Sequence, residues 1–149
     1  MLEKSVTNLV YDPYNRTDKH NEDVLKACRL FGVDTVTIFN VLNVIKEHEI
    51  QIEVLKLAFS AVKDSGMVFV RSMYKNPAKR SGVTKSGTFQ HYKTQNEYLE
   101  IVREVFPNAE LKYGIIIHQN GKKRTGICQR KTLAQHVRDP IRGFYSTGF

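Results

Sequence analysis

Residues 35–70, TVTIFNVLNVIKEHEIQIEVLKLAFSAVKDSGMVFV, contain the pattern that decides the fold. Residues 35–39 are β-branched or aromatic and predict a strand, which runs into a polar turn that carries Asn40 and Asn43. Between residues 47 and 63 the apolar side chains recur at helical spacing, which predicts an amphipathic helix. Its expected inward stripe is Ile50, Val54, Leu57, Ala58 and Ala61.

A second strand follows this helix. Residues 64–66, Asp-Ser-Gly, predict the end of the helix. Residues 67–70, Met-Val-Phe-Val, form a short apolar run between turn signals, which is typical of a central strand buried on both faces. A strand, a helix and a second strand in this order predict a parallel pair in an α/β fold.

The residues before this unit extend the same alternation. Residues 7–11, TNLVY, form an apolar run that ends at Asp12-Pro13 and predicts a buried strand. A helix is expected next, capped by Asn21 and stopped by Gly32. The resulting β-α-β-α-β order predicts a Rossmann-like, mostly parallel sheet with flanking helices.

The residues after this unit predict a helix and a closing hairpin. Thr94 and Glu97 have the spacing of a capping box. The inward side of that helix is expected to consist of Tyr98, Leu99, Val102, Val105 and Phe106. Residues 111–117 predict a strand, residues 120–121, Asn-Gly, a two-residue turn, and residues 122–130 the return strand. The expected α/β sheet therefore ends in a C-terminal antiparallel hairpin.

Length and composition limit the class of protein. With 149 residues, 41% of them hydrophobic, the chain suits one domain, expected at residues 1–130, followed by a basic tail at residues 131–149. No apolar run is long enough for a membrane span, so we expect a cytoplasmic protein without a membrane partner. Neither the two cysteines nor His91 and His118 have metal-ligand spacing, so no metal site is expected.

The formal charge of +8 is concentrated in two segments. Residues 119–149 hold seven Lys or Arg against one acid, and residues 75–93 hold five against none. Such clusters suit a nucleic acid or another polyanion, although a solvated surface explains them equally well. The candidate nucleic-acid-binding residues are Lys79, Arg80, Lys85, Lys122, Lys123 and Arg124.

The order of elements across residues 7–128 resembles the class I S-adenosylmethionine-dependent methyltransferase family from its second strand onward. Residues 9–12, Leu-Val-Tyr-Asp, resemble the second strand and its terminal acid, and residues 35–70 resemble the fourth strand, its helix and the fifth strand. The resemblance implies S-adenosylmethionine as cofactor. It implies that Asp12 accepts hydrogen bonds from the ribose, and that Asn40 and Asn43 lie near the methyl group.

The segment after the first expected strand is similar to a second motif. Asp12-Pro13-Tyr14-Asn15 is close to the Asp/Asn-Pro-Pro-Tyr site of methyltransferases that act on nucleic-acid amines, although it has one proline fewer. Tyr14 therefore joins Asp12 and Asn40 as an expected cofactor-binding residue, and Asn40 and Asn43 are the expected catalytic residues. The alternative for Asp12 is that it only forms a turn.

The glycine loop of that family is the main departure. In relatives a Gly-x-Gly loop precedes the acid by about twenty residues, where the backbone meets the cofactor. Here eleven residues precede Asp12 and none is glycine. The chain is then a shortened or fragmentary member, or another chain or a second copy completes the pocket, or cofactor binding is lost.

Three functions follow from these possibilities. The leading expectation is a methyltransferase-like protein that methylates nucleic acid or a small molecule. The second is a non-catalytic binding or regulatory module that acts through an oligomer or a polyanionic partner. The third is an enzyme that consumes the cofactor without methylating anything.

Overall fold

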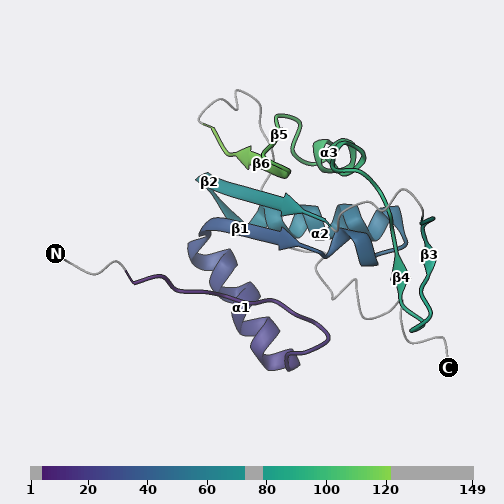
Figure 1. Ribbon diagram of the computed structural model, residues 1–149. Coiled ribbons are helices and arrows are strands. Elements are labelled where there is room, and N and C mark those ends of the chain that lie inside the picture. Colours follow the sequence, from purple (N-terminus) through teal and green to yellow (C-terminus); the bar gives the residue numbers. More distant parts are fainter. Residues whose placement is uncertain (1–4, 73–78, 122–149) are drawn as a thin grey trace.

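The computed structural model describes residues 5–72 and 79–121 of the chain (Figure 1). The elements in chain order are α1 (Asp18–Phe31), β1 (Val33–Phe39), the 3-10 helix η1 (Leu42–Val44), α2 (His48–Ala61), β2 (Val62–Arg71), β3 (Gly82–Val83), β4 (Phe89–Gln90), α3 (Gln95–Arg103), β5 (Glu110–Lys112) and β6 (Ile115–Gln119). Four strands form a mixed sheet in the order β1-β2-β6-β5, with β1 and β2 parallel and the other neighbours antiparallel. The fold is mixed α/β with an antiparallel hairpin at one edge, as predicted. The sheet of the described residues is not mostly parallel, however, because β1–β2 is the one parallel pair among its three neighbouring pairs.

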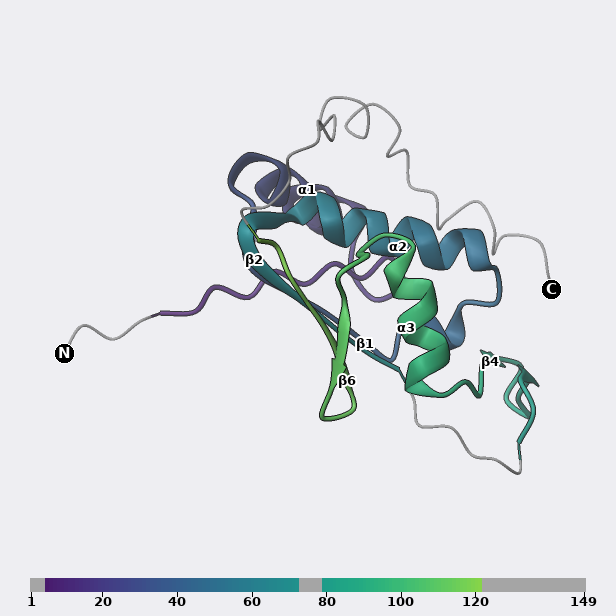
Figure 2. The same cartoon turned by 90° about the horizontal axis from the view of Figure 1, so that it is seen from above.

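The three helices lie on one side of this sheet (Figure 2). On that side Ile38 of β1, Val68 of β2 and Ile116 of β6 are buried. On the opposite side Phe39 is 48% exposed, and Met67 and Phe69 are only half-buried. The prediction that the strand at residues 67–70 is buried on both faces is therefore wrong, because no helix of the described residues covers its second face.

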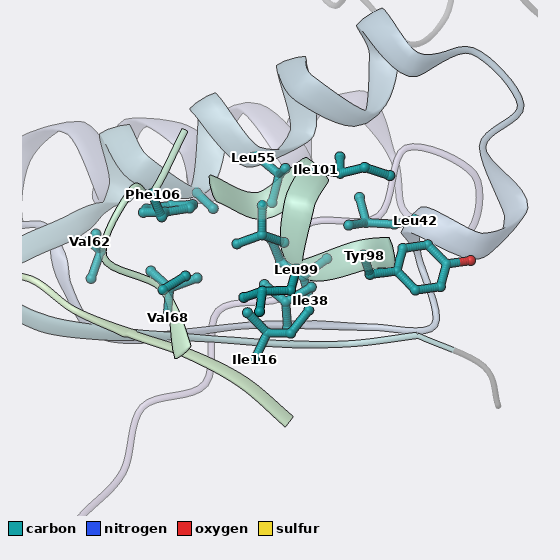
Figure 3. Close-up of a cluster of buried hydrophobic side chains, with 14 residues drawn as sticks. Ile38, Leu42, Leu55, Val62, Val68, Tyr98, Leu99, Ile101, Phe106 and Ile116 are labelled. Carbon is teal, nitrogen blue, oxygen red and sulfur yellow. The ribbon is translucent and has the colours of Figure 1, made fainter. Parts of the chain in front are cut away.

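The core forms where α2 and α3 meet the sheet (Figure 3). Leu42, Leu55, Tyr98 and Phe106 have no exposed surface there. In α2 the buried residues are Ile50, Gln51, Leu55 and Ala58. Ile50 and Ala58 confirm two positions of the predicted stripe, whereas Val54, Leu57 and Ala61 are only half-buried. Contact with both the sheet and α3 sets the rotation of α2, and spacing along the chain does not contain that information.

The predicted capping box of α3 is confirmed. The Thr94 hydroxyl accepts a hydrogen bond from the Glu97 N–H at 3.3 Å, and the Glu97 carboxylate accepts from the Thr94 N–H at 2.6 Å. The inward side is buried as predicted at Tyr98, Leu99, Val102 and Phe106, and Val105 is half-buried. Local side-chain chemistry therefore decides where this helix begins.

The strand predicted at residues 7–11 does not form. Residues 5–10 are exposed, with Val6 at 91%, and no strand of the described residues pairs with them. The helix α1 also begins earlier than predicted, because the Thr17 hydroxyl accepts from the His20 N–H at 3.2 Å and caps it. Asn21, the predicted cap, lies inside the helix and is buried.

The closing hairpin uses a different turn from the predicted one. Residues 111–117 do not form one strand, because Tyr113 and Gly114 take positive φ values of 53° and 74° and join β5 to β6. Two such residues make the tight turn whose twist matches an antiparallel hairpin. Asn120 instead donates its N–H to the Gly66 carbonyl at 3.0 Å. The predicted return strand at residues 122–130 lies outside the described residues.

The junction between α2 and β2 also differs from its prediction. Residues 64–66 do not end the helix, because α2 stops at Ala61 and β2 begins at Val62. The β1–β2 register shifts between Val33 and Thr35, so β2 has extra residues there that have no partner in β1. No helix of the described residues is long and apolar enough to cross a membrane.

Candidate functional site at the carboxyl ends of β1 and β2

Asn40 follows the last residue of β1 at the edge where open α/β sheets bind ligands. It adopts a left-handed conformation with φ 57°, which asparagine tolerates better than most residues. Its backbone N–H donates to the Arg71 carbonyl at 2.8 Å, which joins the end of β1 to the end of β2. The exposed Asn40 amide is therefore held at the carboxyl edge of a parallel pair.

Asn43 lies in η1 and is 1% exposed. Its carbonyl accepts the His91 N–H at 2.7 Å, which attaches the end of the β3–β4 hairpin to this turn. The buried Gln51 amide donates to the Leu42 and Ile45 carbonyls at 2.8 and 2.9 Å and holds η1 from the side of α2. The turn that follows β1 is thus rigidly supported, although the Asn43 Oδ1 atom has no hydrogen-bond partner.

Further polar atoms without partners occur at the same end of the sheet. Six buried side-chain atoms of the described residues lack a hydrogen bond. One of them, His118 Nδ1, lies on β6, where the His118 ring packs against Phe106 in the core with ring centres 4.9 Å apart. The other five are Asn43 Oδ1, Ser72 Oγ, His91 Nδ1, Gln95 Oε1 and Tyr98 OH. We call these five residues the carboxyl-edge cluster. Each such atom costs roughly 1–3 kcal/mol, so their concentration at one place needs a reason.

Hydrogen bonds join four members of the carboxyl-edge cluster in two pairs, Asn43 with His91 and Gln95 with Ser72. The Gln95 side-chain amide donates to the Ser72 carbonyl at 2.7 Å, so the start of α3 contacts the end of β2. Tyr98 lies one turn further along α3, with its ring beside Leu42 and its oxygen pointing away from the apolar side chains (Figure 3). The cluster is therefore built from η1, the end of β2, the residue after β4 and the first turns of α3.

The two titratable members of the cluster are neutral at pH 7. Burial lowers the pKa of His91, and the nearby Lys93 lowers it further. Burial raises the pKa of Tyr98 to about 12, with a smaller contribution from Glu97. The His91 Nε2 atom lies 3.3 Å from the Lys46 carbonyl, which can only accept, so Nε2 bears the proton and Nδ1 is an acceptor.

Asp12 forms a turn before α1. Its Oδ1 atom accepts the N–H groups of Tyr14 and Asn15 at 2.9 and 3.0 Å, and its Oδ2 atom accepts from the Asn15 side chain at 2.9 Å. The buried Asn21 amide bonds to both the N–H and the carbonyl of Asp12 at 3.0 Å. Asp12 and the exposed Tyr14 thus belong to a hydrogen-bonded turn, which Figure 1 shows below the end of β1.

This turn makes a pH prediction. The Asn15 side chain and the N–H groups of Tyr14 and Asn15 lower the pKa of Asp12. A lowered folded-state pKa stabilises the turn above the unfolded value of roughly 4, and this stabilisation is lost as the pH falls through the folded value. The NMR amide shifts of Tyr14 and Asn15 should therefore titrate below pH 4, and Asp12→Asn should abolish that titration. A midpoint at the ordinary aspartate value would contradict the hydrogen bonds described.

The candidate basic residues occupy the neighbouring hairpin. Lys79, Arg80 and Lys85 are exposed in and beside β3 and β4, and the Lys79 Nζ atom lies 5.6 Å from the centre of the Tyr92 ring. Lys122, Lys123 and Arg124 lie outside the described residues. The structure therefore brings three of the six candidate cations to the carboxyl edge that carries Asn40 and Asn43 (Figure 1).

Ser72, His91, Gln95 and Tyr98 were not predicted as site residues. Tyr98 has the spacing of a core residue, and Gln95 is one of several polar residues in a helix start. The basic composition of residues 75–93 suits a polyanion but does not indicate that this segment contacts η1. No signal in the sequence places these side chains together, because they come from the end of β2, the residue after β4 and α3.

No family model, curated protein or solved structure matches the chain. Within residues 5–72 and 79–121, no group of His, Cys, Asp or Glu is arranged to hold a metal ion. The methyltransferase family, its cofactor and its acceptor therefore stay predictions from the sequence.

Proposed function

We propose that this chain is a methyltransferase-like protein that binds S-adenosylmethionine at the carboxyl ends of β1 and β2. The observation that carries the proposal is the parallel β1–β2 pair, whose carboxyl edge holds exposed Asn40 above the carboxyl-edge cluster. A parallel pair followed by an antiparallel hairpin also agrees with the element order that the sequence resembles. Open α/β sheets bind their ligands at this edge.

The residues present fit one side of such a cofactor. Asn40 can both donate and accept from its exposed amide, and Asn43 has an acceptor that lacks a partner. Bound S-adenosylmethionine supplies an electrophilic methyl group, and the transfer needs mainly alignment of an acceptor with it. In this proposal Asn40 and Asn43 bind and orient the reactants. Asp12 contributes through its turn, since its carboxylate already accepts three hydrogen bonds.

The rest of the pocket needs a further strand. The described residues contain no glycine loop before Asp12, and none of their strands pairs with the outer edge of β1. The exposed side chains of Thr35, Thr37 and Phe39 lie on the face that the described helices leave uncovered. A second copy or a partner chain that extends the sheet at β1 would supply the floor of the cofactor site.

Calorimetry with S-adenosylmethionine and its demethylated product tests the proposal. We expect binding, weakened about tenfold by Asn40→Ala through loss of hydrogen bonds to the ligand. Asn108→Ala, an exposed change beyond the far end of α3, is the matched control and should leave the affinity unchanged. No heat up to millimolar concentration, for the isolated chain and for its oligomer, would exclude catalysis. Binding that Asp12→Ala leaves unchanged would remove Asp12 from the site.

The alternative function is a non-catalytic module that binds a polyanion through the basic hairpin. The exposed cations Lys79, Arg80 and Lys85 favour it. Binding of single-stranded DNA should then weaken with salt. The combined changes Lys79→Ser, Arg80→Ser and Lys85→Ser should flatten that dependence by about 0.7 unit of log–log slope for each phosphate that is no longer neutralised. An unchanged slope would eliminate the hairpin as the binding surface.

A further inference from the structure

We propose that the carboxyl-edge cluster binds a nucleobase through its exocyclic amino group. The inference rests on the proposed function, since it assigns a ligand class to the same end of the sheet. The three most buried members are Asn43, Ser72 and Tyr98, each at most 2% exposed, and each has a polar atom without a partner. These side chains are built into the core and are not a chance feature of the surface.

The cluster contains more acceptors than donors. The Gln95 amide already donates to the Ser72 carbonyl, so its Oε1 atom is an acceptor. The Asn43 Oδ1 atom is a second acceptor, and the His91 Nδ1 atom is a third, because the other ring nitrogen faces the Lys46 carbonyl. Among the five unpartnered atoms, only the hydroxyl oxygens of Ser72 and Tyr98 can donate. A ligand that satisfies this set must therefore bring hydrogen-bond donors, and N–H groups are one such class.

The ligand group must also be neutral. None of the five side chains carries a charge at pH 7, since burial lowers the pKa of His91 and raises that of Tyr98. An ammonium group buried without a carboxylate partner is strongly disfavoured. A planar amine conjugated to a ring is neutral, donates two hydrogen bonds and leaves ring nitrogens to accept from the hydroxyls. Adenine and cytosine present this arrangement, whereas hypoxanthine and uracil carry a carbonyl there.

The hairpin beside the cluster provides the remaining contacts of a nucleotide. Phe89 and His91 pack edge to face with ring centres 4.6 Å apart, and Tyr92 lies next to them in the chain. Lys79, Arg80 and Lys85 offer cations for a phosphate. Base stacking on aromatic rings and phosphate contacts by Lys and Arg are the general means by which single-stranded nucleic acid is bound.

The same hairpin gives a route to the buried atoms. β3 and β4 are two residues long each. Among the described residues, His91 joins this hairpin to η1 and the residues after it by hydrogen bonds to the Asn43 and Lys46 carbonyls. Hairpins this short have little stability of their own. Its local displacement exposes the cluster without unfolding the sheet, and a bound base replaces the missing partners.

Titrations of the full chain with paired nucleosides test the inference. Adenosine should bind at least tenfold more tightly than inosine, and cytidine more tightly than uridine, because each pair differs in the exocyclic amine. Tyr98→Phe keeps the buried ring and should lower the affinity for adenosine about tenfold. Tyr113→Phe makes the same change at a fully exposed residue and should have no effect. NMR shifts of the His91 and Gln95 amides should report the binding.

The outcomes separate the inference from the proposed function. One outcome is that S-adenosylmethionine binds, that the affinities for adenosine and inosine are equal, as are those for cytidine and uridine, and that Tyr98→Phe changes none of them. The cluster assignment is then wrong and the methyltransferase proposal stands. If the nucleosides discriminate but S-adenosylmethionine does not bind, the cluster is a base site in a non-catalytic module. If the adenine of S-adenosylmethionine occupies the cluster, Tyr98→Phe should weaken binding of S-adenosylmethionine. If an acceptor base occupies it, the same change should weaken binding of a short single-stranded DNA. Absence of any nucleoside binding at millimolar concentration overturns the inference.

Discussion

Replacing Gly66 with alanine should destabilise the fold by about 3 kcal/mol, because an added Cβ has no room there. It would lie 2.5 Å from the Val62 Cγ2 atom and 2.8 Å from the Asp34 carbonyl oxygen. The Asp34 carbonyl belongs to β1, so the backbone can yield only by separating the two parallel strands. Urea denaturation should show a lower midpoint with an unchanged slope.

Gly82→Ala provides the matched control for this prediction. No atom lies within 4 Å of the Cβ that it would add, and its φ is not positive. Its effect on the free energy of unfolding should therefore stay within about 0.5 kcal/mol. Equal stabilities of the two alanine variants would show that β2 does not approach β1 as closely at Gly66 as described.

Leu55→Ala should destabilise the protein by a similar amount, about 3 kcal/mol, because it removes buried apolar atoms and leaves a residual cavity. Leu55 has no exposed surface and lies on α2 among residues of the sheet and of α3 (Figure 3). Differential scanning calorimetry should show a melting temperature lower by several degrees.

Leu57→Ala is the matched variant, because it makes the same chemical change two residues further along α2. Leu57 is only half-buried, although helical spacing alone puts it in the inward stripe. Its loss should cost about 1 kcal/mol, since much of its side chain already meets solvent. The reverse order of the two effects would mean that the sequence pattern places α2 correctly and that its rotation in the structure is wrong.

Both structural tests bear on the candidate site. The β1–β2 pairing that Gly66 permits brings Thr37 beside Phe69 and continues to the hydrogen bond between Asn40 and Arg71. Disturbing that pairing should therefore weaken ligand binding as well as stability. The Leu55 variant should lower stability with a smaller effect on the position of Asn40, since Leu55 contacts the core side of the sheet.

Local patterns predicted the elements whose causes are local. The β-branched run within Val33–Phe39 and the apolar spacing within His48–Ala61 each correspond to an observed element. The capping box at Thr94 is observed with both of its hydrogen bonds. In the helix and its cap, neighbours within four residues supply the interactions that form the element. The strand also needs its parallel pairing with β2, which the strand-helix-strand order provides.

Predictions that depended on a partner strand were less accurate. Residues 7–11 have the composition of a strand, but a strand needs a neighbour, and the described residues provide none. Residues 111–117 alternate in the manner of one strand, yet Tyr113 and Gly114 reverse the chain. The turn predicted at Asn120-Gly121 follows β6 and leads into residues that lie outside those described.

For the candidate site, the sequence alone determined that Asn40 and Asn43 follow a strand of a parallel pair, because strand-helix-strand order already implies it. Only the tertiary structure brought Ser72, His91, Gln95 and Tyr98 to the turn that holds Asn43, since β2, β4 and α3 contribute them. The physical reason is that periodicity reports which side of one element is apolar, whereas a cluster of unpartnered polar atoms arises only where several packed elements meet.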